Sequence, residues 1–282
     1  MTNTIHPCLW FDGQAKAAAD FYCSIFTNSK ITASTPMVVT FELNGNKLMG
    51  LNGGPMFKMN PSISLFVTCK SVSETNAIWA RLIDGGSALM PLDQYPWSER
   101  YGWLQDKFGM TWQISVATND DAELKIKPSM LFTGSQFGRA GEAIQFYSSV
   151  FDHSSTEMLV LYPAEDQHAG KVMYSEFKLN QYNLIAMDGP GVHDFSFNEA
   201  VSFVVECETQ EEIDYYWTKL TEGGHESMCG WLKDKFNVSW QIVPKIIVSI
   251  LSNPENVPKV MKALMHMKKL DIETLIIASE IP

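Results

Sequence analysis

The chain has 282 residues, of which 45% are hydrophobic, 12% aromatic and 19% charged, and its formal net charge is −11. This length suffices for two domains with cores of their own, and the aromatic content with only 13 prolines excludes collagenous, low-complexity and disordered classes. No apolar run reaches the roughly 18–20 residues that span a bilayer, and residues 1–11 lack the features of a secretory signal. The five cysteines are odd in number and have no CxxC spacing, so we expect free thiols in a cytoplasmic protein.

The first 117 residues predict strands that alternate with two helices. An apolar strand precedes an amphipathic helix in which apolar residues recur at helical spacing. Asn44-Gly45 is typical of a tight hairpin turn, because both residues tolerate positive φ. For the second helix we expect Ser73 as the N-cap and Gly85-Gly86 at the end. The predicted strands are 8–12, 37–43, 47–51, 63–69, 88–92, 102–106 and 111–116, and the predicted helices are 15–26 and 73–83.

An internal repeat organises the chain. The segment GWLQDKFGMTWQI at 102–114 returns as GWLKDKFNVSWQI at 230–242, with nine of 13 positions identical. Two earlier blocks return in the same order, and three matched blocks make chance implausible. We therefore expect two copies of one domain, 1–117 and 128–244, and a helical tail, 245–282. The two other matched blocks are 21–26 with 146–151, and 64–69 with 202–207.

The two copies differ in length at two places. Copy two is longer around 162–170, and copy one is longer around 87–100. Such differences fall in loops and edge strands, where added backbone stays exposed. The extra segment of copy one carries Pro91, Tyr95, Pro96 and Trp97, so we expect a wall or lid that copy two lacks.

These residues carry a resemblance. Phe11-Asp-Gly, the later Phe21-Tyr22 and the closing Gly-Trp-Leu-x-Asp-Lys-Phe-x-x-x-Trp-Gln-Ile resemble the PhnB-like family of the vicinal-oxygen-chelate (glyoxalase/bleomycin-resistance) superfamily. The segment 260–272 is similar to the C-terminal extension of tandem PhnB-like proteins. The resemblance implies an α+β fold of two tandem glyoxalase-like domains with C-terminal helices. Each domain would hold two βαβββ modules that form a cupped, mostly antiparallel sheet around a cavity.

The resemblance also implies a test for a metal site. Active superfamily members hold a divalent ion by His, Glu or Gln from the first, fourth, fifth and eighth strands, and the ion acts as a Lewis acid. Serine hydroxyls are poor ligands for such an ion, and neither copy supplies three good ones. We therefore expect no metal and no other cofactor, with a divalent ion as the alternative. The matching positions are Gln113 and Gln241, Ser64 and Ser202, Pro7–Cys8 and Pro128–Ser129, and Asn52 and Asp188, with His6 outside the register.

Other chemical candidates are few. His193 with Asp188 is the one histidine pairing that we keep as a metal or acid/base candidate. Cys8 has no evident base, so it is interpreted as a small buried hydrophobe. Some members of the family carry the label 3-demethylubiquinone methyltransferase, but this chain has no glycine-rich loop with the strand and helix of an S-adenosylmethionine-binding domain. The catalytic residues stay unknown.

Aromatic residues predict where a ligand binds. Four tryptophans are predicted to lie in the core. An apolar pocket of copy one is expected to be lined by Trp10, Trp97, Trp103 and Met49, with Gln113 as its one polar contact. Such a lining suits a small organic ligand held by shape and stacking. Gln241, the counterpart of Gln113 in copy two, completes the predicted ligand-binding residues. The four core tryptophans are Trp79, Trp112, Trp217 and Trp240.

Charge limits the partners. Residues 1–117 carry eight basic and eight acidic side chains, whereas 118–244 carry eight basic and 20 acidic ones. The acidic second copy argues against nucleic acid and anionic membrane as partners. We expect a protein that binds an apolar or aromatic metabolite, with the copies paired within the chain and a homodimer left open. The alternatives are a metal-dependent lyase, isomerase or dioxygenase, and a purely structural or sequestering protein.

Overall fold

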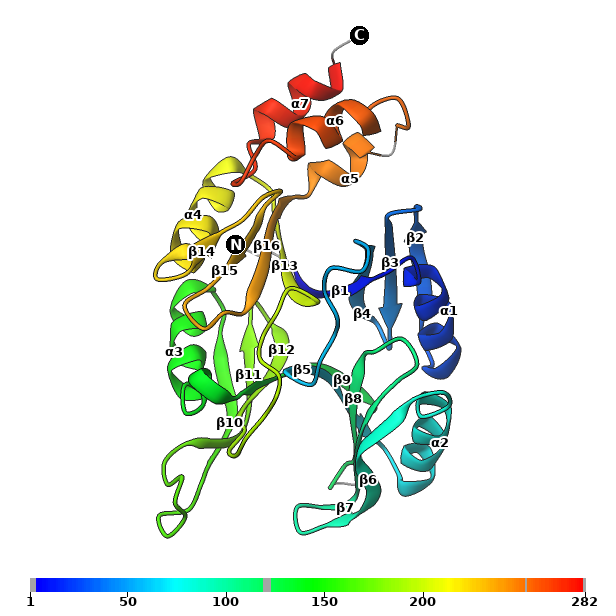
Figure 1. The fold of residues 1–282 in the computed structure, drawn as a ribbon, viewed down its shortest axis with the longest axis vertical. Helices are drawn as coiled ribbons and strands as arrows, with labels where there is room; N and C mark the ends of the chain where they lie inside the picture. The colour runs from blue at the N-terminus through cyan, green and yellow to red at the C-terminus, as the bar shows by residue number, and fades with distance from the viewer. Residues whose placement is uncertain (1–3, 119–122, 252, 281–282) are drawn as a thin grey trace.

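The computed structural model describes residues 4–118, 123–251 and 253–280 (Figure 1); the predicted domain ends at 1–3 and 281–282 lie outside these ranges. The first half contains β1 (Ile5–Phe11), α1 (Ala15–Ile25), β2 (Lys30–Ser34), β3 (Val38–Leu43), β4 (Asn46–Asn52), β5 (Ile63–Cys69), α2 (Val72–Leu82), β6 (Ser87–Tyr95), β7 (Ser98–Gln105) and β8 (Thr111–Val116). The second half contains β9 (Lys125–Phe132), the 3-10 helix η1 (Gly134–Gln136), α3 (Ala140–Val150), β10 (Ser155–Leu161), β11 (Val172–Leu179), β12 (Tyr182–Asp188), β13 (Val201–Cys207), α4 (Gln210–Thr221), β14 (His225–Glu226), β15 (Trp231–Lys233) and β16 (Ser239–Pro244). The tail forms α5 (Ile246–Leu251), α6 (Val257–Leu264) and α7 (Ile272–Glu280).

The predicted strands and helices of copy one are present, with two differences. Strand β2 was not predicted, because Lys30–Ser34 is an edge strand whose residues are mostly exposed and show no apolar alternation. The N-cap of α2 is Ser71, not Ser73: its hydroxyl accepts a hydrogen bond from the backbone N–H of Glu74. The Asn44-Gly45 turn is as predicted, with φ of 48° and 79°.

Two eight-stranded sheets form the body of the molecule. Sheet A has the order β14-β15-β16-β13-β1-β4-β3-β2, and sheet B has the order β10-β11-β12-β9-β5-β8-β7-β6. In each sheet five of the seven neighbouring pairs are antiparallel, so the predicted α+β class and the mostly antiparallel sheets are confirmed.

The modules are combined differently from the expectation that each copy forms its own sheet. Sheet A joins β1–β4 of copy one to β13–β16 of copy two through the antiparallel β1–β13 pair. Sheet B joins β5–β8 to β9–β12 through the antiparallel β5–β9 pair. Each sheet therefore takes one module from each copy. The two modules of one copy instead meet through aromatic packing: Tyr22 of α1 contacts Trp112 of β8 at 5.1 Å between ring centroids.

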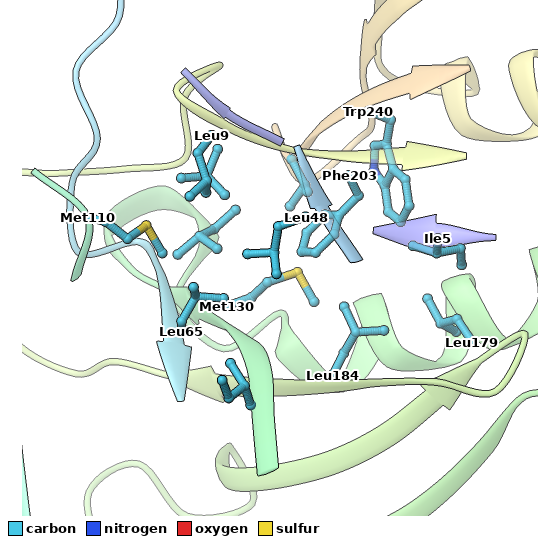
Figure 2. Close-up of a cluster of buried hydrophobic side chains, with 14 of the residues drawn as sticks. Ile5, Leu9, Leu48, Leu65, Met110, Met130, Leu179, Leu184, Phe203 and Trp240 are labelled. Atoms are coloured by element: carbon cyan, nitrogen blue, oxygen red, sulfur yellow. The ribbon is translucent and has the colours of Figure 1, made fainter. Parts of the chain in front are cut away.

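One hydrophobic core lies between the two sheets. Figure 2 shows Leu9, Leu48 and Phe203 of sheet A facing Leu65 and Met130 of sheet B, and all five side chains are at most 1% exposed. Burial of this continuous apolar surface is the main stabilising contribution, at roughly 25 cal/mol per Å². The core holds the two sheets together as one body.

The tail packs on one end of sheet A and has a small core of its own. Backbone N–H groups of Cys229 and Gly230 donate to carbonyls of Met267 and Lys268, and the Gln210 side chain bonds the backbone at Leu270 and Ile272. Among the described residues, no helix has the length and apolarity needed to cross a membrane.

Candidate functional site

The strands of each sheet present two different faces, because successive side chains alternate. One face packs on the shared core, and the other points away from it, on the inside of the bend that each sheet makes in Figure 1, with α1 to α4 on the outside. We call the inner faces concave face A and concave face B. Face A is defined by His6, Cys8, Trp10, Lys47, Met49, Ser202, Glu206, Trp231 and Gln241, and face B by Ser64, Phe66, Tyr101, Trp103, Gln113, Lys127, Ser129, Tyr174 and Glu176.

A hydrogen-bonded amide lies at the centre of face B. The Gln113 Nε2 donates to Ser64 Oγ at 2.7 Å and lies 3.5 Å from Ser129 Oγ, and its Oε1 accepts from the Tyr101 hydroxyl at 2.8 Å. All four residues are at most 6% exposed. These bonds fix the amide orientation, and burial raises the pKa of Tyr101, so its hydroxyl stays a donor.

Aromatic rings surround this amide. The Phe66 ring lies 6.3 Å from Tyr101 and 6.1 Å from Tyr174. Tyr95 and Trp97, from the β6–β7 hairpin, stack at 5.0 Å and both contact Tyr101 edge-on. Because Trp97 is 60% exposed, the group extends from the buried centre to the surface.

Trp103 adds an unpartnered donor to face B. It is the register partner of Gln113 on the neighbouring strand. Its indole Nε1 is buried, and no acceptor for it is present among the described residues. A buried donor without a partner costs about 1–3 kcal/mol, so an acceptor atom of a ligand would be stabilised there.

Face B also holds a partly buried ion pair. Lys127 Nζ donates to the Glu176 carboxylate, which also accepts from the Tyr174 hydroxyl at 2.6 Å. The Lys127 side chain is 8% exposed and that of Glu176 is 26% exposed. Burial by itself would raise the pKa of Glu176, but the hydrogen bonds from Lys127 and Tyr174 hold it below its ordinary value. Glu176 is therefore ionised at neutral pH.

Face A repeats the amide but differs around it. Gln241 Nε2 donates to Ser202 Oγ at 2.9 Å, and Cys8 occupies the place of Ser129. Burial raises the pKa of the Cys8 thiol to about 12, so it is not an activated nucleophile. His6 is 1% exposed; burial, with Lys47 as a smaller cause, lowers its pKa to about 3. The His6 imidazole is therefore neutral, and its Nδ1 is buried without a partner in the described part of the chain.

Further contacts on face A differ from those on face B. Lys47 and Glu206 form an ion pair at 2.5 Å across β1. Trp10 packs edge-on against Phe57 and Trp231, at 5.0 and 6.0 Å.

The structure separates the predicted ligand-binding residues into two groups. Trp97, Trp103 and Gln113 belong to sheet B, whereas Trp10, Met49 and Gln241 belong to sheet A. The single copy-one pocket that the sequence predicted is therefore not formed. The cause is the combination of modules from both copies in each sheet, which places the first module of copy one beside the second module of copy two.

The positions that the resemblance assigns to a metal do not fit a hard or borderline divalent ion. In register, the neighbour of Cys8 on the parallel strand is Met49, and the neighbour of Ser129 is Ile185. With the serines and glutamines, each face thus lacks a carboxylate or an imidazole at these four positions. Among the described residues, no group of three or more His, Cys, Asp and Glu side chains is placed to hold a metal ion.

The fourth-strand residues that the sequence singled out have structural roles instead. Asn52 Oδ1 accepts from the backbone N–H of Ala15, at the start of α1. The Asp188 carboxylate accepts backbone N–H bonds from Gly138 and Ala140, at the start of α3, and from Val172, at the start of β11. His193 bonds the Pro190 carbonyl, at 3.1 Å, so the pairing of His193 with Asp188 is not observed.

A hollow of about 440 Å³ lies elsewhere, at the ends of β5 and β8. It is open and is lined by residues such as Lys70, Glu99 and Val116. None of the predicted site residues lines it, and its walls contain no buried polar cluster comparable to those of the concave faces.

The sequence did not predict the ion pair of face B or the role of Tyr174. Lys127 and Glu176 lie on different strands, and no motif links them. Nothing in the sequence distinguishes Tyr174 from other aromatic residues on strands. A signal was nevertheless available for Lys127, because a lysine two residues before Ser129 falls on the same strand face as that predicted position.

Comparisons with known proteins place this geometry in context. A family model described as 3-demethylubiquinone-9 3-methyltransferase matches residues 3–115 and again 124–243. A solved structure described as a putative 3-demethylubiquinone-9 3-methyltransferase, PhnB protein, from Bacillus cereus is 35% identical; the match covers 39% of this chain and 96% of that chain, with a TM-score of 0.37. Glyoxalase I from Zea mays is 8% identical over 85% of this chain and 92% of that chain, with a TM-score of 0.54. This match establishes similarity of fold only. No protein of curated function matches.

Proposed function

We propose that the chain binds a small aromatic or apolar molecule on concave face B. The chain belongs to the 3-demethylubiquinone-9 3-methyltransferase family of PhnB-like proteins. It has the fold of glyoxalase I, within the vicinal-oxygen-chelate superfamily. The observation that carries this proposal is the buried, unpartnered indole N–H of Trp103. Trp103 lies two residues from Tyr101 on the same face of β7, and the Tyr101 ring contacts Phe66. A flat ligand that stacks on these rings would supply the missing acceptor.

Several features support binding without chemistry on a metal. The four positions of the superfamily chelate carry no carboxylate or imidazole on either face, and the buried Cys8 thiol has a raised pKa. A methyltransferase reaction also lacks support, because these mostly antiparallel sheets do not have the parallel, doubly wound topology of a dinucleotide-type domain. A cytoplasmic location is part of the proposal, supported by five free thiols.

The test uses the internal repeat as its control. Trp103 and Trp231 are equivalent residues of the two copies, and the first lies on face B, the second on face A. A panel of small aromatic compounds is titrated while tryptophan fluorescence and the thermal midpoint are followed. We expect quenching by at least one compound in the wild type and in Trp231→Phe, and a loss of roughly ten-fold in affinity in Trp103→Phe, in line with one lost hydrogen bond.

Two outcomes would contradict the proposal. If no compound changes the fluorescence or the thermal midpoint, the protein is structural or sequestering. If chelator-free protein binds a stoichiometric divalent ion and added ions raise the thermal midpoint, the metal-dependent enzyme becomes the better interpretation.

A further inference from the structure

Positive charge gathers at one end of face B, although the whole chain carries −11. Lys125 and Lys127 follow one another on the same face of β9, and Lys178 lies on the nearby β11. Two carboxylates, Glu157 and Glu176, lie among them. Lys178 and Lys127 contribute to the lowered pKa of Glu157, and Lys127 and Lys125 contribute to that of Glu176. Three ammonium groups against two carboxylates leave this end of face B with a net positive charge.

Lys127 is the buried member of this group. Its side chain is 8% exposed, whereas that of Lys178 is 36% exposed. An ammonium group has three N–H donors, and within the described residues Glu176 is the recorded acceptor for Lys127. An anionic group of a ligand at this place would therefore meet a partly desolvated cation, where charge-assisted hydrogen bonds are stronger than at the surface.

Aromatic surface adjoins this lysine. Phe66 is the register partner of Lys127 on β5. Its ring contacts Tyr101 on one side and Tyr174 on the other, and the Tyr174 hydroxyl bonds the same Glu176 carboxylate that Lys127 bonds. A stacking surface and a buried cation thus lie side by side on neighbouring strands.

From this juxtaposition we propose that the ligand of face B is an aromatic carboxylate, whose ring packs on Phe66 and Tyr174 and whose carboxylate is held by Lys127. This inference rests on the proposed function and narrows it. Lys127 then bridges the ligand and Glu176, and the neighbouring Lys125, whose charge also lowers the pKa of Glu176, offsets the repulsion between the two carboxylates.

Face A provides an internal comparison. By the repeat, the position of Lys127 is taken by His6, whose imidazole is neutral, and the position of Phe66 is taken by Val204. The ion pair of face A, Lys47 with Glu206, comes from strands on either side of β1. Face A therefore lacks both the ring and the lysine at these positions, and the carboxylate preference belongs to face B.

The experiment measures affinity for matched pairs of probes by calorimetry. Each pair consists of an aromatic acid and its neutral amide, such as 2-naphthoate and 2-naphthamide. With the wild-type protein we expect the acid to bind at least ten-fold more tightly than the amide. In the double variant Lys127→Met with Glu176→Gln, which leaves no unpaired buried charge, we expect the amide to keep its affinity and the acid to lose its advantage.

The control is the matched double variant on the other face, Lys47→Met with Glu206→Gln, which should keep the full preference for the acid. Equal affinities of acid and amide for the wild type would overturn the carboxylate assignment and leave the binding function standing. If neither probe of any pair binds, both proposals fail. A preference that survives in the Lys127→Met, Glu176→Gln variant would also refute the role of Lys127, and the wild-type comparison stands even if that variant does not fold.

Discussion

Asp234, in the turn before β16, accepts four hydrogen bonds inside the core. Its donors are the backbone N–H groups of Phe236 and Val238, the Trp240 indole and the Tyr147 hydroxyl, at 2.7–3.1 Å. Burial is the largest influence on this carboxyl: it raises the pKa of Asp234 to about 6, although all four bonds lower it. Asp106 has the equivalent place in copy one, and burial raises its pKa too.

Asp234 therefore gives stability a definite pH dependence. An unfolded aspartate releases its proton near its ordinary pKa, given as 3.8, whereas the folded one releases it near 6. The stabilising contribution is full below about pH 4 and falls by about 3 kcal/mol as pH rises through 6. In Asp234→Asn this pH dependence of the free energy of unfolding is absent. The variant is less stable at all pH values, because its amide N–H₂ group lies against N–H and O–H donors and cannot accept their hydrogen bonds.

Urea unfolding of wild type and Asp234→Asn between pH 4 and pH 7 measures the effect. The stability difference between them should be largest at pH 4 and narrow toward pH 7. Asp12→Asn, at an exposed position, serves as the control and should shift stability by less than about 0.5 kcal/mol. A difference that widens with rising pH would show that the folded carboxyl ionises more readily than the unfolded one.

Most of the repeated block that identified the family proves to be structural. Asp234 ties the turn to Trp240, and Lys235 lies over the Phe146 and Phe236 rings. Gln241 is the residue of the pattern Trp-Gln-Ile that faces away from the core. The sequence therefore predicts the fold from this block well, and only the glutamine position of the site, because side chains on the core face make up most of the recognisable pattern.

At the scale of elements, the two β-hairpins that close the first module of each copy use different turn residues. In copy one the turn is Asn44-Gly45, whereas copy two has Asn180-Gln181 with φ of 47° and 67°. Glutamine in this left-handed region costs roughly 1 kcal/mol more than glycine, because its Cβ crowds the backbone.

We therefore expect Gln181→Gly to raise the free energy of unfolding by about 1 kcal/mol. The reverse change in copy one, Gly45→Gln, should lower it by a similar amount. A Cβ at Gly45 would lie 3.5 Å from Asn28 Nδ2, an ordinary contact, so the effect comes from φ and not from a clash. Chemical denaturation measures both; a loss of stability in Gln181→Gly would argue against the left-handed geometry of this turn.

Local patterns predicted the elements where a cause was local, and failed where it was not. The hairpin at Asn44-Gly45 was predicted because the φ requirement lies in the turn itself. Strand β2 was missed because pairing with β3 alone makes it a strand. The β6–β7 hairpin carries Tyr95 and Trp97, as predicted. Their contact with Tyr101 on face B depends on the order of the strands in the sheet, which the local sequence does not specify.

At the scale of the whole molecule, the sequence predicted duplication but not the partner of each module. The β1–β13 and β5–β9 pairs join strands far apart in the chain, and strands of similar apolar pattern accept either partner. The predicted binding residues were assigned to one pocket on the assumption that each copy closes on itself. The ion pair of Lys127 with Glu176 could not be predicted either, because it depends on the sheet order, in which β9 and β11 lie on either side of β12.

The shared core predicts that the two sheets unfold together. Leu65 of β5 is 1% exposed in that core, so Leu65→Ala should cost about 2–5 kcal/mol. Hydrogen exchange should then accelerate by the same factor in β9 of sheet B and in β13 of sheet A. Leu89→Ala, at a 42% exposed position on β6, is the control and should have little effect. Acceleration confined to sheet B would mean that the sheets unfold independently.

Because each sheet contains strands of both copies, the fold also constrains how this gene can evolve. Ile5 lies opposite Val205, and Ile63 lies opposite Met130, so residues from different copies must remain compatible at both seams. Recombination that replaced one half of the gene with a diverged homologue would mismatch both seams at once. Covariation among related sequences should therefore couple positions of the two copies across these seams more strongly than it couples β1 to β5 within a copy.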